Sequence, residues 1–207
     1  MSKIIPIHKN PYGDNKQLFG TSQIEFEKGI NVLVGCNGTG KTTIIKQTQQ
    51  YLDKEALKYI SFDNQFQGRS HTMQIALNRG NIDVAGALAT SSEGECINVC
   101  LSEFAASIGS FIRKNTDQNE LFIFFDAVDS GFSIDNIVDF KDFLNELVIP
   151  DASFCDLYIV IAANAYETCR NERCIDACTG KIVSFNDYDE YFKFVMSSRK
   201  IKDKRYS

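Results

Sequence analysis

The chain has 207 residues, of which 43% are hydrophobic and 24% charged, a balance typical of one globular domain with a substantial core. Its net charge of −5 excludes a surface that attracts DNA or acidic membranes as a whole. No apolar run approaches the ~20 residues of a membrane span and nothing resembles an export signal, so we expect a cytoplasmic protein without membrane contacts.

Short apolar runs predict strands at 3–7, 22–26 and 30–35. A helix is expected from about 39 to 52, followed by a strand at 58–62. The segment from about 63 to 90 is polar and has poor periodicity.

Apolar residues at helical spacing predict a helix from about Gly94 to Lys114. The continuous apolar runs and the turn signals that follow predict a strand at 121–125, a helix at 133–147 stopped by Pro150, a strand at 157–163, a hairpin at 174–185 and a helix from about Asp187. Apolar strands that alternate with helices indicate an α/β fold, with a mostly parallel sheet covered by helices on both faces. The opening strands suggest an added antiparallel β element.

Seven cysteines are expected to be free thiols in the cytoplasm rather than disulfides. Four of them are close enough in sequence to consider zinc: Cys155, Cys169, Cys174 and Cys178. However, no CxxC pair is present and no histidine is nearby. Core or surface thiols are therefore favoured over a zinc site.

The strongest motif is "GCNGTGKT", residues 35–42, which follows an apolar strand and opens a helix. Its glycines let backbone N–H groups point at phosphate oxygens, and the helix N-terminus favours negative charge. Lys41 is expected to reach the β- and γ-phosphates, and the Thr42 hydroxyl to bind Mg²⁺. The motif therefore predicts nucleotide binding. The expected contacts are Gly35, Cys36, Asn37, Gly38, Thr39, Gly40, Lys41, Thr42 and Thr43.

Asp126 ends the apolar run 121–125, at the sheet edge where α/β proteins bind ligands. A carboxylate there suits the Walker B role of holding Mg²⁺. Alternatively, Asp126 is an ordinary aspartate in a turn. With a P-loop in the same chain, the metal role is favoured.

Four segments resemble those of the ABC-type ATPases, in the form found in the SMC, Rad50 and RecF branch. "KYISFDNQ" is similar to the Q-loop, "SSEGE" to the signature, "DAVDSGFS" to the Walker B and D-loop, and "VIAANAYE" to the switch segment. They occur in the order of that family, and the resemblance covers about residues 20 to 185.

The resemblance implies that Gln65 contacts the nucleotide and its metal. It also implies that Ser92, Gly94 and Glu95 contact a nucleotide held by a second copy, from a helical subdomain at about 66–114. The pattern Ser92-x-x-Glu95 before an apolar helix is also a capping box, and the two interpretations are compatible. Tyr12, upstream of the P-loop, is a candidate for adenine stacking, or else part of an ordinary loop.

Other P-loop classes fit less well. A GTPase should show an N-K-x-D motif downstream of the P-loop, and a small-molecule kinase an arginine-rich lid, and neither is present. About fifty residues without heptads separate Thr42 from Ser91, so no long coiled-coil arm is expected.

Two positions depart from the family in the chemical step. Ala127 stands where the family has the glutamate that positions the attacking water, and Asn164 where it has the switch histidine. Alanine cannot act as a base and asparagine cannot carry a proton. Asp129 is a candidate substitute for the glutamate, although an aspartate there can equally cap a turn.

With these two departures, the resemblance implies an ATP-dependent dimerising clamp that uses ATP and Mg²⁺, hydrolyses ATP slowly, and forms a homodimer with composite sites. The expected partner is an effector protein or a nuclease, with DNA contact confined to the basic C-terminal segment 198–207. A non-catalytic ATP sensor or scaffold is the main alternative. An ATPase subunit of a membrane transporter fits least well.

Overall fold

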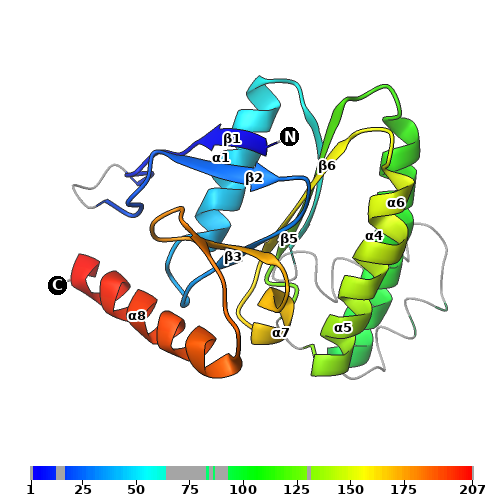
Figure 1. Ribbon diagram of the computed structural model, residues 1–207. Helices are drawn as coiled ribbons and strands as arrows, with labels where there is room; N and C mark the ends of the chain where they lie inside the picture. Colours follow the sequence, from blue (N-terminus) through cyan, green and yellow to red (C-terminus); the bar gives the residue numbers. More distant parts are fainter. Residues whose placement is uncertain are drawn as a thin grey trace.

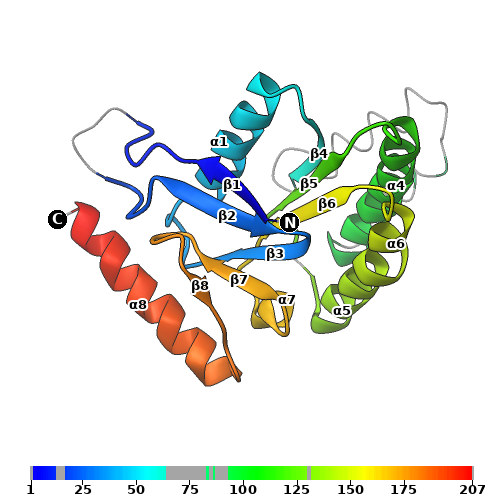
Figure 2. The ribbon, with the colours of Figure 1, turned by 45° about the horizontal axis from the view of Figure 1, so that its top comes forward.

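The computed structural model describes residues 2–12, 17–63, 83, 86, 93–129 and 132–206. Its centre is a six-stranded sheet in the order β4-β5-β6-β3-β7-β8 (Figures 1 and 2). The first five of these strands are parallel and β8 is antiparallel to β7. Their bounds are β3 Gly29–Val34, β4 Lys58–Asp63, β5 Glu120–Asp126, β6 Asp156–Ala162, β7 Arg173–Asp176 and β8 Ile182–Val183.

The strands are apolar on both sides because both faces of the sheet are covered. In β5, Leu121, Ile123 and Phe125 face one core, and Phe122 and Phe124 face the other. The first core is closed by α4 (Glu93–Lys114) and α5 (Ile134–Phe143), and the second by α1 (Lys41–Lys54). Figure 1 shows α1 on the opposite side of the sheet from α4 and α5. The expected α/β arrangement is confirmed.

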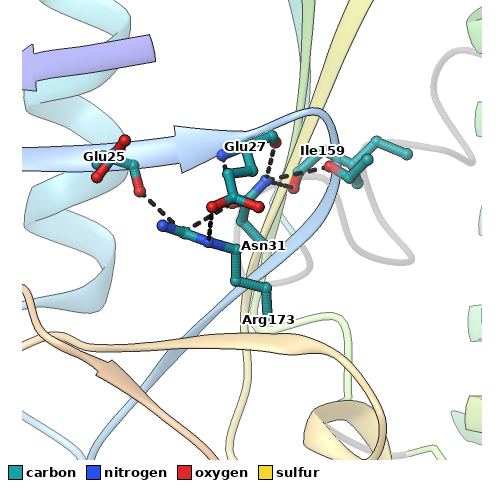
Figure 3. Close-up of polar contacts among 6 residues, drawn as sticks. Glu25, Glu27, Asn31, Ile159 and Arg173 are labelled. Carbon is teal, nitrogen blue, oxygen red and sulfur yellow. Dashed lines mark hydrogen bonds and ion pairs between the residues drawn. The ribbon is translucent and has the colours of Figure 1, made fainter. Parts of the chain in front are cut away.

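The expected antiparallel element is a separate two-stranded sheet of β1 (Ser2–Pro6) and β2 (Gln23–Glu27), which packs over α1 and the second core. The fully buried Asn31 side chain, at the start of β3, joins this element to the main sheet (Figure 3). Its Oδ1 accepts the Glu27 N–H at 2.9 Å, and its Nδ2 donates to the Glu27 and Ile159 carbonyls. Arg173 donates to Asn31 Oδ1 and to the Glu25 carbonyl, so one network ties β2, β3, β6 and β7.

One predicted boundary is wrong. Pro150 does not stop the helix that begins at Ile134: α5 continues as a π-helical turn η1 (Leu144–Val148) and a short α6 (Ile149–Asp151) that contains the proline. A proline lacks an N–H and crowds the carbonyl four residues before it, so it does not fit the interior of a regular α-helix. The π turn immediately upstream uses hydrogen bonds between residues five apart, so the α-helical bond that the proline would break is not required there. The helical segment therefore ends three residues beyond η1.

Two helices complete the chain: the short α7 (Tyr166–Cys169) after β6, and α8 (Tyr188–Tyr206) at the C-terminus. The basic segment from residue 198 forms the last turns of α8, and Ser198 is buried. Among the described residues, no helix is long and apolar enough to cross a membrane. Within the part of the chain whose side chains are described, five cysteines are buried and carry free thiols: Cys36, Cys155, Cys169, Cys174 and Cys178.

Candidate functional site

Three strands end together at the edge where the motif residues lie. Ala162, the last residue of β6, pairs with Leu33 of β3 on one side and with Asp126 of β5 on the other. Because the three strands are parallel and in register, the P-loop after β3, Asp126 at the end of β5 and Asn164 after β6 leave the sheet at one place.

The segment 35–40 forms a tight loop between β3 and α1, and its geometry requires glycine. Gly40 has φ +102°, and a Cβ there would lie 2.6 Å from the ring of Phe19, which is buried against the loop. The Thr39 hydroxyl donates to the Cys36 carbonyl at 2.8 Å and closes the loop from inside. Helix α1, which has 14 residues, begins immediately after this loop. The positive end of its dipole therefore lies at the site.

Lys41 is held inside the loop. Its Nζ donates to the Gly35 carbonyl at 2.8 Å, to the Cys36 carbonyl at 3.4 Å and to Asn164 Oδ1 at 3.0 Å. Burial lowers the pKa of Lys41, and the carboxylates of Asp129 and Asp126 oppose that change. A cation so poorly solvated favours an anionic ligand.

Thr42 and Asp126, the two residues expected to hold Mg²⁺, lie next to each other. The Thr42 hydroxyl hydrogen-bonds the Asp126 carboxylate, which is buried at the end of β5. Burial raises the pKa of Asp126; the Thr42 hydrogen bond lowers it, and the nearby Asp63, paired with Asp126 in the sheet, raises it further. A desolvated carboxylate next to a hydroxyl and a second carboxylate is a set of oxygen donors that Mg²⁺ prefers.

A cavity of about 560 Å³ lies over these residues, within the range of small-molecule sites. Tyr12 and Leu18 form part of its wall, and the Tyr12 hydroxyl lies 3.0 Å from Thr43 Oγ1. Ala127 also lines it, in a left-handed conformation with φ +56° that is costly for a residue other than glycine. The complete lining is Tyr12, Leu18, Asn37, Gly38, Gly40, Lys41, Thr42, Thr43, Asp126, Ala127, Ala162 and Asn164.

Asn164 and Asp129 meet behind Lys41. Asp129 Oδ2 accepts the backbone N–H groups of Asn164 at 2.5 Å and of Ala165 at 2.6 Å. Asp129 Oδ1 is buried and has no hydrogen-bond partner among the described residues. Asp129 thus caps the turn before α7, and one of its oxygens remains available on the buried side.

The other predicted site residues are not placed by this geometry. Gln65 and Ser92 lie outside the described residues. Gly94 and Glu95 belong to the first turn of α4, but the Glu95 side chain and the surroundings of Gly94 lie outside the description. Their expected roles therefore stay predictions.

Sequence reasoning missed four residues that contact the site. Leu18 and Ala162 line the cavity, but neither was predicted as a site residue. Ser198 and Tyr191 of α8 hydrogen-bond the P-loop and the Asn164 backbone. Their spacing of seven residues places them on one face of α8. Charged residues of both signs are spread along this helix, so the sequence does not show which face is buried.

Comparison with known proteins gives a limited result. No protein-family model matches the chain. A segment of 71 residues, 34% of this chain, is 34% identical to the DNA double-strand break repair Rad50 ATPase of Methanopyrus kandleri, and the match covers 7% of that protein's length. This local similarity suggests a relationship to the P-loop, ABC-like ATPases, and hence ATP binding.

Proposed function

We propose that this chain is an ABC-type ATP-binding protein that closes as a dimer around ATP and Mg²⁺ and hydrolyses ATP slowly. One observation carries the proposal: a single cavity is lined by part of the loop 35–40 together with Lys41, Thr42, Asp126 and Asn164. The loop and the α1 N-terminus supply N–H groups for the phosphates, and Lys41 supplies the charge. The local similarity to a Rad50 ATPase agrees with this choice of ligand.

The donor set fits Mg²⁺. Thr42 and Asp126 would hold the ion, since a hydroxyl and a carboxylate are hard oxygen ligands and the two already contact each other. When bound, Mg²⁺ neutralises charge on the β- and γ-phosphates. Gln65 is proposed as a further ligand on the basis of family resemblance alone.

The proposed dimer places the P-loop of one copy opposite the signature Ser92–Glu95 of the other. In this arrangement the whole chain is one ATP-binding domain, and the segment 66–114 is its helical subdomain. The signature contacts the γ-phosphate only in the closed dimer, so ATP shifts the population towards closure. The closed dimer would act on an effector protein or a nuclease, with DNA contact at the basic end of α8.

A second function is favoured by Ala127, which cannot orient or deprotonate water. In this alternative the protein is a non-catalytic sensor, and ATP only assembles a complex. Both functions share the binding site and differ in turnover, so a phosphate-release assay with purified protein separates them.

Calorimetry with Mg²⁺·ATP tests the binding site. We expect saturable binding by the wild type and none by Lys41→Ala, because the variant removes the positive charge from the phosphate site. Lys54→Ala, at the exposed far end of the same helix, is the control and should bind like the wild type. Equal affinity in all three proteins would rule out the P-loop assignment.

Light scattering with and without Mg²⁺·ATP tests the dimer. Ser92→Arg should block ATP-driven dimerisation and leave ATP binding by the monomer unchanged, since the signature acts on the other copy. If Ser92→Arg still dimerises with ATP, then Ser92 is only a helix cap.

A further inference from the structure

Helix α8 touches the candidate site with one face. Tyr191, Ser198 and Lys202 are separated by seven and four residues, so they lie along one side of the helix. Tyr191 and Ser198 are buried, whereas the neighbours Ser197 and Arg199 are exposed. Figures 1 and 2 show α8 running beside the chain where β3 leads into α1.

The first contact fixes the P-loop. The buried Cys36 N–H donates to Ser198 Oγ at 2.9 Å, while the Ser198 hydroxyl donates to the Val195 carbonyl at 2.8 Å. Close by, the Lys202 stem passes Gly38: a Cβ at that glycine would lie 3.3 Å from Lys202 Cδ. The Cys36 N–H group is therefore oriented by a side chain that lies 162 residues away in the sequence.

The second contact fixes the segment after β6. The Tyr191 hydroxyl donates to the Asn164 carbonyl at 2.7 Å. Burial raises the pKa of Tyr191, so its phenol stays protonated and remains a donor at neutral pH.

These two contacts converge on Lys41. Cys36 and Asn164, the residues that α8 holds through their backbones, are also two of the three acceptors of the Lys41 ammonium, through the Cys36 carbonyl and Asn164 Oδ1. A shift of either peptide group would change where the ammonium rests and which loop N–H groups face the cavity.

We propose that Ser198 and Tyr191 are positioning residues for nucleotide binding, through which α8 fixes the P-loop and Asn164 on either side of Lys41. The inference rests on the proposed function, since it assigns a role in binding Mg²⁺·ATP at that site. It also makes α8 and the site one linked unit: whatever displaces α8 weakens nucleotide binding, and nucleotide binding stabilises α8 in return.

The test measures Mg²⁺·ATP affinity by calorimetry in the full-length chain. Ser198→Ala leaves the buried Cys36 N–H without an acceptor, and we expect its affinity to fall about tenfold or more. Tyr191→Phe leaves the Asn164 carbonyl without its donor, and we expect a loss of about threefold to tenfold. The matched controls are Ser197→Ala and Tyr188→Phe, both exposed on the same helix, and both should bind like the wild type.

Conservative variants of Ser198 distinguish a positioning role of its hydroxyl from a role in packing alone. Ser198→Thr keeps the hydroxyl and should bind within about threefold of the wild type, whereas Ser198→Cys keeps the volume but offers only a weak acceptor and should bind like Ser198→Ala. If Ser198→Ala does not fold, the comparison of Ser198→Cys with Ser198→Thr decides in its place. A purely structural role would instead make the larger threonine the worse variant.

Hydrogen exchange gives a second readout. Mg²⁺·ATP should slow amide exchange in α8 of the wild type, and this protection should be lost in Ser198→Ala. Affinities of Ser198→Ala and Tyr191→Phe within twofold of the wild type would overturn the inference and leave the proposed function intact. A wild type that does not bind Mg²⁺·ATP would overturn both.

Discussion

Asn164 Oδ1 accepts a hydrogen bond from Lys41 Nζ at 3.0 Å. The contact joins the segment after β6 to the P-loop, and both residues line the cavity. Asn164 is itself fixed on both sides, because its N–H is bound by Asp129 and its carbonyl by Tyr191. The side chain at 164 therefore faces the place where the phosphates of a nucleotide are expected. A charge introduced at this position should change the affinity for the nucleotide.

Asn164→Asp should weaken ATP binding at least tenfold. A carboxylate at 164 would form an ion pair with Lys41 and repel the γ-phosphate, and both effects are strong in a partly buried site. Calorimetry measures the change, and Asn164→Ala is the comparison: it removes the contact without adding charge and should lose less affinity than Asn164→Asp. Equal affinities in the two variants would mean that residue 164 lies away from the phosphates.

Asp129→Ala should lower the free energy of unfolding by about 2 kcal/mol, since the N–H groups of Asn164 and Ala165 both lose their acceptor. Urea denaturation measures this loss, with the exposed Asp139→Ala on α5 as the control. Asp129→Asn retains an acceptor and should lose less. The rate of phosphate release by Asp129→Asn should match the wild-type rate. If Asp129→Asn folds normally but releases no phosphate, Asp129 is instead the group that positions water.

Asp126→Asn should raise the melting temperature of the metal-free protein at neutral pH. Because burial raises the pKa of Asp126 in the folded state, its ionised form costs stability above that pKa, and the cost disappears as pH falls through it. The gain from Asp126→Asn should therefore shrink between neutral pH and about pH 4, near the ordinary value for a carboxyl group.

The same variant should lose most of the Mg²⁺ dependence of ATP binding, which calorimetry with and without the metal measures. For the wild type, protonation of Asp126 should weaken Mg²⁺·ATP binding on the acid side, and at a higher pH than for an exposed carboxylate. An equally metal-dependent Asp126→Asn variant would remove Asp126 from the metal site.

Asn31→Val should destabilise the fold by about 2 kcal/mol, or roughly 4–8 °C in melting temperature, because the Glu27 N–H loses its acceptor inside the protein. Arg173 would lose an acceptor as well. Differential scanning calorimetry measures the change, and Gln23→Val on the exposed side of β2 is the control. An unchanged melting temperature would mean that β1 and β2 attach to the sheet through apolar packing alone.

The parts that sequence reasoning identified are those with a local signal. The P-loop requires particular residues at fixed spacing, and the apolar run of β5 places Asp126 at the sheet edge by strand geometry alone. Both features are set by residues within about ten positions of each other.

The parts that it missed depend on tertiary contacts. The role of Ser198 requires knowing that α8 returns to the P-loop, and the mixed charge of that helix gives no amphipathic signal. The two amides that Asp129 binds lie 35 and 36 residues away in sequence. The continuation of the helix through Pro150 depends on a π turn that residue propensities do not predict.

Ala127→Glu should raise the rate of phosphate release at least tenfold. Ala127 lines the cavity immediately after Asp126, so a carboxylate added there would enter the site where the resembling family has its water-positioning glutamate. A general base is worth about 10²–10⁴-fold, and only part of that is expected from an unoptimised position. Since alanine already occupies a left-handed conformation at φ +56°, glutamate adds little further backbone strain.

The matched control is Ala127→Gly, which removes the left-handed penalty without adding a carboxylate. It should raise the free energy of unfolding by up to about 1 kcal/mol, because glycine adopts this conformation freely. Its phosphate release should stay at the wild-type rate, so a gain in Ala127→Glu alone is due to the carboxylate and not to a relaxed backbone. Brisk turnover by the wild type, unimproved by glutamate at 127, would instead mean that hydrolysis uses another group and that the slow clamp is the wrong description.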